Sequence, residues 1–116
     1  MTLVIEGSGG AVGLIGIKGI CRRSQRAEIW IYIGETESWG KGLGTAAIKT
    51  LCDYAFYQMN LHRIWLECDP ENIGAVRCYE KNGFRKEGVH RDGYYRNGRY
   101  WDTVTMGLLR TDGKVK

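Results

Sequence analysis

The stretch WGKGLGTAAIKTL, residues 39–51, decides the fold of this chain. Three alternating glycines, at positions 40, 42 and 44, lead into a segment whose apolar residues recur at helical spacing. Glycine costs about 1 kcal/mol inside a helix, so glycines at a helix entry indicate close approach of a ligand or another backbone. The N–H groups that begin a helix attract anions, and Lys41 adds a full positive charge. The stretch predicts a phosphate or pyrophosphate site at the start of a helix over 44–59.

Segments on both sides of this helix predict the strands of a sheet. Three β-rich segments lie upstream and indicate an antiparallel meander, in residues 3–5, 12–20 and 27–34. Glycines in the second segment indicate bulges or close approach of another group. Downstream come a strand over 62–69, a helix that begins near Asn72 and stops at Asn82-Gly83, and a hairpin that turns at Asn97-Gly98.

The resulting order, β-β-β-α-β-α-β-β, predicts an α/β (α+β) fold. Its sheet is mixed and mostly antiparallel, because only one crossover joins parallel strands. That crossover runs from residues 27–34 to residues 62–69, and its helix begins at the glycines.

Length and composition predict one domain over residues 1–116. No apolar run approaches the roughly 18 residues of a membrane helix, and no signal peptide is recognisable, so the predicted location is cytoplasmic. The four cysteines form no C-x-x-C pair and the two histidines are far apart, which favours reduced structural thiols and predicts no metal. The net charge of +4 fits nucleic acid, an anionic cofactor or simple solubility.

Three interpretations of the glycine turn compete before any family is considered. A P-loop is excluded because no Gly-Lys-Ser/Thr stands at the required offset. A dinucleotide fingerprint is present at Gly42, Gly44 and Ala47, with Asp69 at the end of the next strand. The polar segment ETESW before the turn and the antiparallel strands upstream argue against that fingerprint. A tight helix entry without a ligand is the third interpretation.

The chain resembles the GNAT superfamily of N-acetyltransferases, in its ribosomal-protein and spermidine N-acetyltransferase branch. The acetyl-CoA loop of that family reads Q/R-x-x-G-x-G/A, and residues 39–44 read Trp-Gly-Lys-Gly-Leu-Gly, with Trp39 in place of Gln or Arg. The block LECDPENIGAVRCYEKNGF is similar to the family's strand and helix, with Asn72, Tyr79 and Asn-Gly-Phe at the expected offsets. The resemblance covers residues 12–110 and implies a GNAT-like fold with splayed central strands.

The family implies an acetyl-CoA-dependent N-acetyltransferase in which a primary amine attacks acetyl-CoA directly in a ternary complex. The alternative is a CoA-binding module that does not catalyse. The resemblance places pantetheine along a strand edge at Tyr32, Ile33 and Gly34, where its amides can pair with the backbone. It places the pyrophosphate on main-chain N–H groups of the loop, in Gly40, Lys41, Gly42, Leu43, Gly44 and Thr45.

Three side chains match functional positions of the family, and each also has a structural interpretation. Asn72 matches the cofactor-contacting asparagine and is equally suited to cap its helix. Tyr79 matches the general acid that protonates the CoA thiolate, while its spacing alone favours a core aromatic. Glu67 stands where some ribosomal-protein acetyltransferases carry a general base, and it is otherwise a solvated or ion-paired carboxylate.

The family usually has a strand and two helices before the segment that begins here, and these elements wall the acceptor site. We therefore expect a reduced wall, a wall supplied by a second subunit, or a fragment that binds cofactor without turnover. The aromatic content and the short N-terminal part predict a homodimer. The acceptor is a small-molecule amine or a protein N-terminus. Nucleic acid is not expected, because the hairpin accounts for the alternation in YYRNGRYW.

Overall fold

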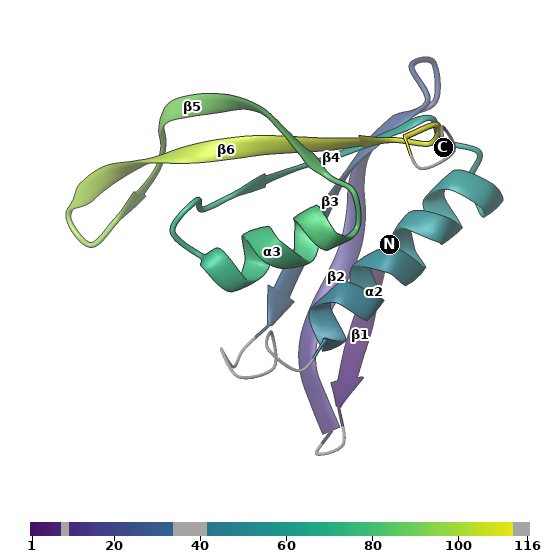
Figure 1. The fold of residues 1–116 in the computed structure, drawn as a ribbon, viewed down its shortest axis with the longest axis horizontal. Helices are drawn as coiled ribbons and strands as arrows, with labels where there is room; N and C mark the ends of the chain where they lie inside the picture. The colour runs from purple at the N-terminus through teal and green to yellow at the C-terminus, as the bar shows by residue number, and fades with distance from the viewer. Residues whose placement is uncertain (8–9, 34–41, 113–116) are drawn as a thin grey trace.

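The computed structural model describes residues 1–7, 10–33 and 42–112 (Figure 1). The order of elements agrees with the predicted one, apart from the π-helix η1 that follows the first helix. The elements are β1 (Thr2–Gly7), β2 (Gly10–Cys21), β3 (Arg26–Ile33), α2 (Leu43–Asp53), η1 (Tyr54–Gln58), β4 (Arg63–Cys68), α3 (Ile73–Lys81), β5 (Arg85–Arg96) and β6 (Arg99–Leu109).

The strands form one six-stranded sheet in the order β1-β2-β3-β4-β6-β5. Every neighbouring pair is antiparallel except β3 and β4, so the predicted parallel crossover is confirmed. β3 and β4 pair over only three positions, from Arg26 with Arg63 to Glu28 with Trp65. Beyond these pairs the two strands diverge, as Figure 1 shows, which confirms the predicted splay.

Glycines of β2 allow a bulge and a close approach of a neighbouring side chain, as the sequence indicated. The ladder between β2 and β3 shifts register between Lys18 and Cys21, around Gly19 with its φ of 61°. A Cβ atom at Gly16 would collide with the Trp30 ring of the neighbouring strand. β2 therefore contains one bulge and one point of close approach.

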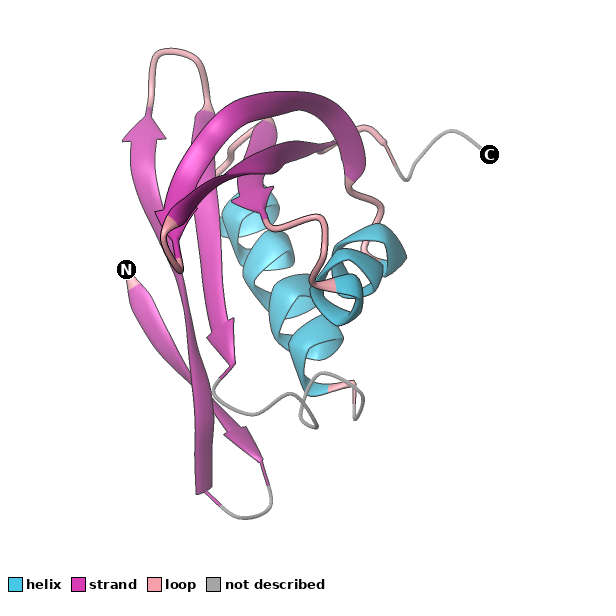
Figure 2. Cartoon of the chain, turned by 90° about the vertical axis from the view of Figure 1, so that its left-hand side faces the viewer, coloured by secondary structure: helices cyan, strands magenta, loops and turns pink. Residues whose placement is uncertain are grey.

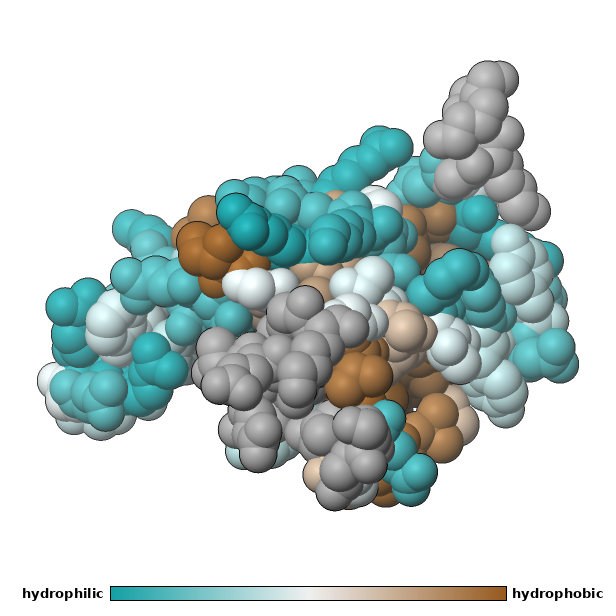
Figure 3. All heavy atoms as spheres, turned by 60° about the horizontal axis from the view of Figure 1, so that its bottom comes forward, coloured by the Kyte–Doolittle hydropathy of each residue, from teal (hydrophilic) through white to brown (hydrophobic). Residues whose placement is uncertain are grey.

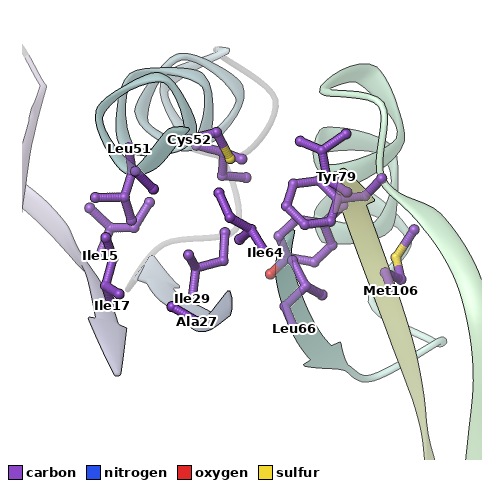
Figure 4. Packing of buried hydrophobic residues seen from close by; sticks show 14 of the residues in the cluster. Ile15, Ile17, Ala27, Ile29, Leu51, Cys52, Ile64, Leu66, Tyr79 and Met106 are labelled. Carbon is purple, nitrogen blue, oxygen red and sulfur yellow. The ribbon is translucent and has the colours of Figure 1, made fainter. Parts of the chain in front are cut away.

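The described helices lie on one side of the sheet (Figure 2). α2 turns Ile48, Leu51 and Cys52 toward the sheet, as its apolar spacing predicts. These side chains meet residues of β2, β3 and β4 in a single buried cluster, part of which is drawn in Figure 4. None of the described helices has the length and hydropathy needed to cross a bilayer.

The helix predicted over 44–59 changes type near its end. α2 stops at Asp53, and the next turn is a π-helix, in which the Met59 N–H donates to the Tyr54 carbonyl at 3.1 Å. Both helix types place apolar residues on one face over so short a distance, so spacing alone does not distinguish them.

The predicted stop of α3 and the predicted hairpin turn are both confirmed. Gly83 has a φ of 94°, and the Phe84 N–H donates to the Tyr79 carbonyl at 3.1 Å, as in a Schellman motif. Asn97 and Gly98 both have positive φ between the paired residues Arg96 and Arg99, as a type I′ turn requires.

Candidate functional site

The divergence of β3 from β4 leaves an open strand edge at the centre of the sheet. β3 runs on to Ile33 and β4 to Cys68, and in the described part of the chain these extensions do not pair with each other. On its other edge β3 remains paired, with Tyr32 opposite Leu14. An open edge presents backbone N–H and C=O groups to which an amide-bearing ligand can bind. The Tyr32 side chain is 62% exposed.

The described part of the predicted anion loop begins at Gly42. This residue has a φ of 80° and is the N-cap of α2, and among the described residues no side chain caps the helix there. Its carbonyl accepts the Ala46 N–H at 3.0 Å, which closes the first turn. The preceding N–H groups, from Leu43 to Thr45, belong to the helix start that favours anions. Gly34, Gly40 and Lys41 lie outside the described residues, as does the side chain of Ile33.

A side chain from α3 fixes the start of α2. Asn82, the C-cap of α3, donates from Nδ2 to the Thr45 carbonyl at 3.1 Å and to the Cys78 carbonyl at 2.9 Å. The first turn of α2 is therefore held against the last turn of α3, although 37 positions separate the two residues. From the sequence, Asn82 was expected only to end its helix, and its contact with α2 was not predicted.

Asn72 is the N-cap of α3. Its Oδ1 accepts the Ala75 N–H at 3.2 Å, so the capping interpretation is confirmed. Nδ2 has no hydrogen-bond acceptor among the described residues and is available for another contact. The preceding turn is held by Asp69, whose Oδ1 accepts the Glu71 N–H at 2.9 Å.

Tyr79 is buried between α3 and the sheet. Its ring meets Phe84 edge-on, with centroids 6.2 Å apart, and Figure 4 shows it reaching toward β4 beside Ile64 and Leu66. Burial raises the pKa of the Tyr79 phenol well above its usual value, and the nearby thiols of Cys68 and Cys78 add to the effect. The phenol is therefore protonated throughout the neutral range and can donate a proton.

Glu67 lies on the opposite face of β4 from Tyr79. Ile64 and Leu66 are buried toward the helices, so the alternation of the strand turns Glu67 outward. Its Oε1 accepts the Thr103 hydroxyl at 3.0 Å and lies 2.6 Å from Nδ1 of His90. Glu67 is thus neither free nor simply solvated, because side chains from β6 and β5 hold it.

The carboxyl end of β4 lies near both candidate catalytic side chains, Glu67 on the strand itself and Tyr79 on α3. Cys68, the last residue of β4, lies near the phenol on the helix side, and burial raises the pKa of its thiol to about 11. Glu67 precedes it and points to the other side. Glu67 and Cys68 both follow Trp65, which is the last position at which β4 pairs with β3. A ligand in the splay would have a proton donor on one side and a carboxylate on the other.

Sequence reasoning did not identify His90 as part of this site. Tyr94 pairs with Trp101, so an unbroken ladder would place His90 opposite Thr105. The structure pairs His90 with Thr103 instead, because the register shifts between His90 and Tyr94. The only available signal, counting back from the Asn97-Gly98 turn, would have given the wrong partner.

Arginines and aromatic residues of the β5–β6 hairpin contact one another. The Arg99 guanidinium lies 3.7 Å from the centroid of the Trp101 ring, and Arg96 lies 5.5 Å from that ring. Arg96 also pairs with Asp69 at 3.6 Å, and Tyr94 donates its hydroxyl to the same carboxylate at 3.0 Å. These contacts account for the composition of YYRNGRYW within the hairpin itself and tie the hairpin to the end of β4.

Described residues form a polar hollow and an apolar one on different parts of the molecule. The polar one, of about 300 Å³, lies between the β4–α3 loop and the hairpin, lined by Asp69, Pro70, Glu71, Arg99, Tyr100, Trp101 and Asp102. An apolar groove of about 250 Å³ lies between β1, β2 and the first turns of α2, and its walls include Leu3, Val4, Leu43 and Ala47. Figure 3, which brings the lower side of Figure 1 forward, shows apolar surface among polar residues.

The chain matches known acetyltransferases in both sequence and structure. The model of the acetyltransferase (GNAT) domain matches residues 1–85. An uncharacterized N-acetyltransferase, p20 of Bacillus licheniformis, is 32% identical over 111 residues, which cover 96% of this chain and 62% of that protein. The spermidine N(1)-acetyltransferase of Escherichia coli K12 is 41% identical over 81 residues, which cover 70% of this chain and 43% of that protein.

A solved structure, the dodecameric spermidine N-acetyltransferase from Vibrio cholerae in an intermediate state, superposes with a TM-score of 0.85 at 34% identity. The superposition covers 97% of this chain and 66% of that chain. The present chain therefore corresponds to less than two thirds of the length of each of these three proteins.

Proposed function

This chain belongs to the GNAT superfamily of N-acetyltransferases, and from that premise we propose that it transfers an acetyl group from acetyl-CoA to a small primary amine. The observation that carries the proposal is the splay between β3 and β4, which begins after Glu28 and Trp65. The glycine-led start of α2 and the buried Tyr79 lie on the helix side of the sheet. The supports for cofactor binding and for proton donation therefore belong to the same face.

The described residues fit acetyl-CoA as a substrate. Backbone groups of Tyr32 and Ile33 would pair with the pantetheine amides, because the strand edge that faces β4 is open there. The N–H groups of Leu43, Gly44 and Thr45 would bind the pyrophosphate, since no side chain of the described residues caps that helix start. We assign Gly34, Gly40, Lys41 and Gly42 to the same cofactor site, and Nδ2 of Asn72 as a further contact.

The proposed chemistry is a direct acyl transfer in a ternary complex. Glu67 takes a proton from the ammonium group of the acceptor, and the neutral amine attacks the thioester carbonyl carbon. A C–N bond forms, the attacking nitrogen releases its second proton to water, and the C–S bond breaks, so the electron pair of that bond leaves with sulfur. Tyr79 donates its phenolic proton to the departing thiolate and regains a proton from water. The raised pKa of this phenol keeps it protonated at neutral pH, so its O–H group is present as a hydrogen-bond donor when the thiolate appears.

The acceptor that we propose to test first is a polyamine. Relatives of this chain are named spermidine acetyltransferases, and the polar hollow beside the end of β4 is lined by three carboxylates, those of Asp69, Glu71 and Asp102, and by one guanidinium, that of Arg99. Asp69 is also paired with Arg96, so among the described residues the carboxylates exceed the cations at this site by one. Negative charge in a hollow attracts a polycationic amine. A protein N-terminus is the second acceptor class.

CoA binding without turnover is the second candidate function. The cofactor contacts proposed above involve the backbone of β3 and α2, whereas catalysis requires Glu67 and Tyr79 in addition. A chain could therefore bind the cofactor through the first set and lack a working acceptor site.

The deciding experiment measures both CoA binding and acetyl transfer to an amine. Calorimetry with acetyl-CoA and CoA measures binding, and thiol release measures transfer to spermidine, spermine, amino acids and a peptide N-terminus. We expect binding of acetyl-CoA together with turnover of at least one amine. Binding without turnover across the panel favours the second candidate, and absence of binding up to millimolar acetyl-CoA contradicts both.

A further inference from the structure

The Glu67 carboxylate is held by one of its two oxygens. Oε1 is bound by the Thr103 hydroxyl at 3.0 Å and lies 2.6 Å from Nδ1 of His90. Oε2 has no hydrogen-bond partner among the described residues. The three side chains come from β4, β6 and β5, which are consecutive neighbours in the sheet. One oxygen is therefore fixed across three strands while the other remains available.

The imidazole that holds Glu67 is itself restrained. Nε2 of His90 lies 3.4 Å from the Thr105 hydroxyl, so both ring nitrogens face a polar group. Gly93 makes room for this arrangement, because a Cβ atom there would collide with the Thr103 side chain. The glycine lies in the stretch of β5 where the register shift brings His90 opposite Thr103.

Neighbouring charges on the same strands are already paired with each other. Arg63 of β4 and Glu87 of β5 form a two-pronged pair, with N–O distances of 2.9 and 2.6 Å. This pair reaches across β6 just as Glu67 and His90 do. It leaves His90 as the only titratable partner of Glu67 among the described residues.

We propose that His90 is a positioning residue that orients Glu67 as the base, an inference that rests on the proposed function. His90 and Thr103 fix Oε1, so Oε2 is left to accept the proton of the acceptor amine. The proton passes from the ammonium group to Oε2 and then to water, and His90 only keeps the carboxylate in place. The pair is exposed, and exposed pairs contribute little to stability, so its value lies in orientation.

Matched amide variants test this inference. His90→Asn places an amide N–H near the position of Nδ1, whereas His90→Gln places one near Nε2. We expect His90→Asn to retain kcat within about threefold, and His90→Gln and His90→Ala to lower kcat about 10-fold or more, as for other orienting residues. The KM for acetyl-CoA should stay within about twofold in all three, because no cofactor contact is changed.

A control variant and a double variant complete the design. Glu87→Gln breaks the parallel Arg63–Glu87 pair on the same strands and should leave kcat unchanged. His90→Gln should add little to the loss caused by Glu67→Gln, because both variants remove one function. Melting curves for every variant show whether a loss of kcat comes from unfolding.

The outcomes separate this inference from the proposed function. Turnover in the wild type with no loss in His90→Gln and His90→Ala overturns the inference and leaves the function standing. Equal losses in His90→Asn and His90→Gln also overturn it, because a correctly placed donor would then be insufficient. If His90→Ala does not fold, the comparison of Asn with Gln decides. A wild type that binds acetyl-CoA and acetylates no amine overturns both.

Discussion

Tyr79 combines a packing role with a proposed chemical one. Its ring belongs to the hydrophobic cluster, and burial there raises the pKa of its phenol. The same burial therefore stabilises the fold and keeps the hydroxyl in the form that can donate a proton. No choice between a core tyrosine and a general acid is required at this position.

We expect Tyr79→Phe to lower kcat by about 10²–10⁴-fold, the usual contribution of a positioned acid. The ring remains, so packing and the affinity for acetyl-CoA should change little. Steady-state rates and calorimetry check both parts, and Tyr95→Phe, which alters an exposed tyrosine, is the control. Because the raised pKa keeps the phenol neutral, no loss of rate below pH 9 should come from its ionisation. A rate within about twofold of wild type would mean that Tyr79 is a core residue only.

Asn72 allows its confirmed capping role to be separated from the proposed cofactor contact. Asn72→Ala should destabilise the protein by about 1 kcal/mol, since it removes the bond to the Ala75 N–H. Asn72→Ser keeps a capping oxygen but removes the amide, so stability should be close to wild type. Both variants should weaken acetyl-CoA binding equally if Nδ2 contacts the cofactor. Melting curves and calorimetry decide, and wild-type affinity in Asn72→Ser would limit Asn72 to the cap.

At the scale of elements, the proposed cofactor site depends on the start of α2. Acetyl-CoA should raise the melting temperature of the wild type, because it binds the native state alone. Gly42→Val should abolish most of that shift, since Gly42 has a φ of 80°, which a branched side chain rarely adopts.

Gly19→Val is the matched control for this prediction. Gly19 has a φ of 61°, and, as at Gly42, a Cβ atom there would meet no atom of the described residues within 4 Å. It should lower the melting temperature of the free protein and preserve the shift caused by acetyl-CoA. If both variants keep the shift, the pyrophosphate does not bind at the Gly42 turn. A shift with NADH and none with acetyl-CoA would favour the dinucleotide interpretation instead.

Elements with a clear period or a specific stop signal were predictable, and irregular ones were not. Ile48 and Leu51 define the buried face of α2, and Asn97-Gly98 fixes the hairpin, because both depend on local chemistry. The π-turn at Tyr54–Gln58 and the register shift between His90 and Tyr94 depend on tertiary packing. His90 was missed for that reason, since one shift in a ladder changes which residues face each other.

At the scale of the whole molecule, we predict a homodimer. β1 is an edge strand with the exposed apolar residues Leu3 and Val4, and it borders the apolar groove against α2. Such a surface favours association with another chain. The cytoplasmic location stays a prediction from sequence.

Sedimentation velocity at micromolar concentration tests the association. We expect a dimer for the wild type and a monomer for Val4→Glu, which puts a charge on the 56% exposed position in β1. Val89→Glu is the matched control, because Val89 is 59% exposed on the opposite edge strand, β5. A wild type that sediments as a monomer contradicts the prediction, and dissociation by Val89→Glu in place of Val4→Glu would move the interface to the hairpin.

The short pairing of β3 with β4 also bears on how the native state opens. β1 to β3 form one continuous ladder and β4 to β6 another, and among the described residues three ladder pairs, in addition to the shared core, join these two halves of the sheet. The two halves are thus candidates for foldons, units that open separately from each other. The opening free energies that amide hydrogen exchange measures should then differ between them. A ligand bound in the splay would contact both halves and oppose their separate opening. Amide exchange should therefore slow in both halves when the ligand binds.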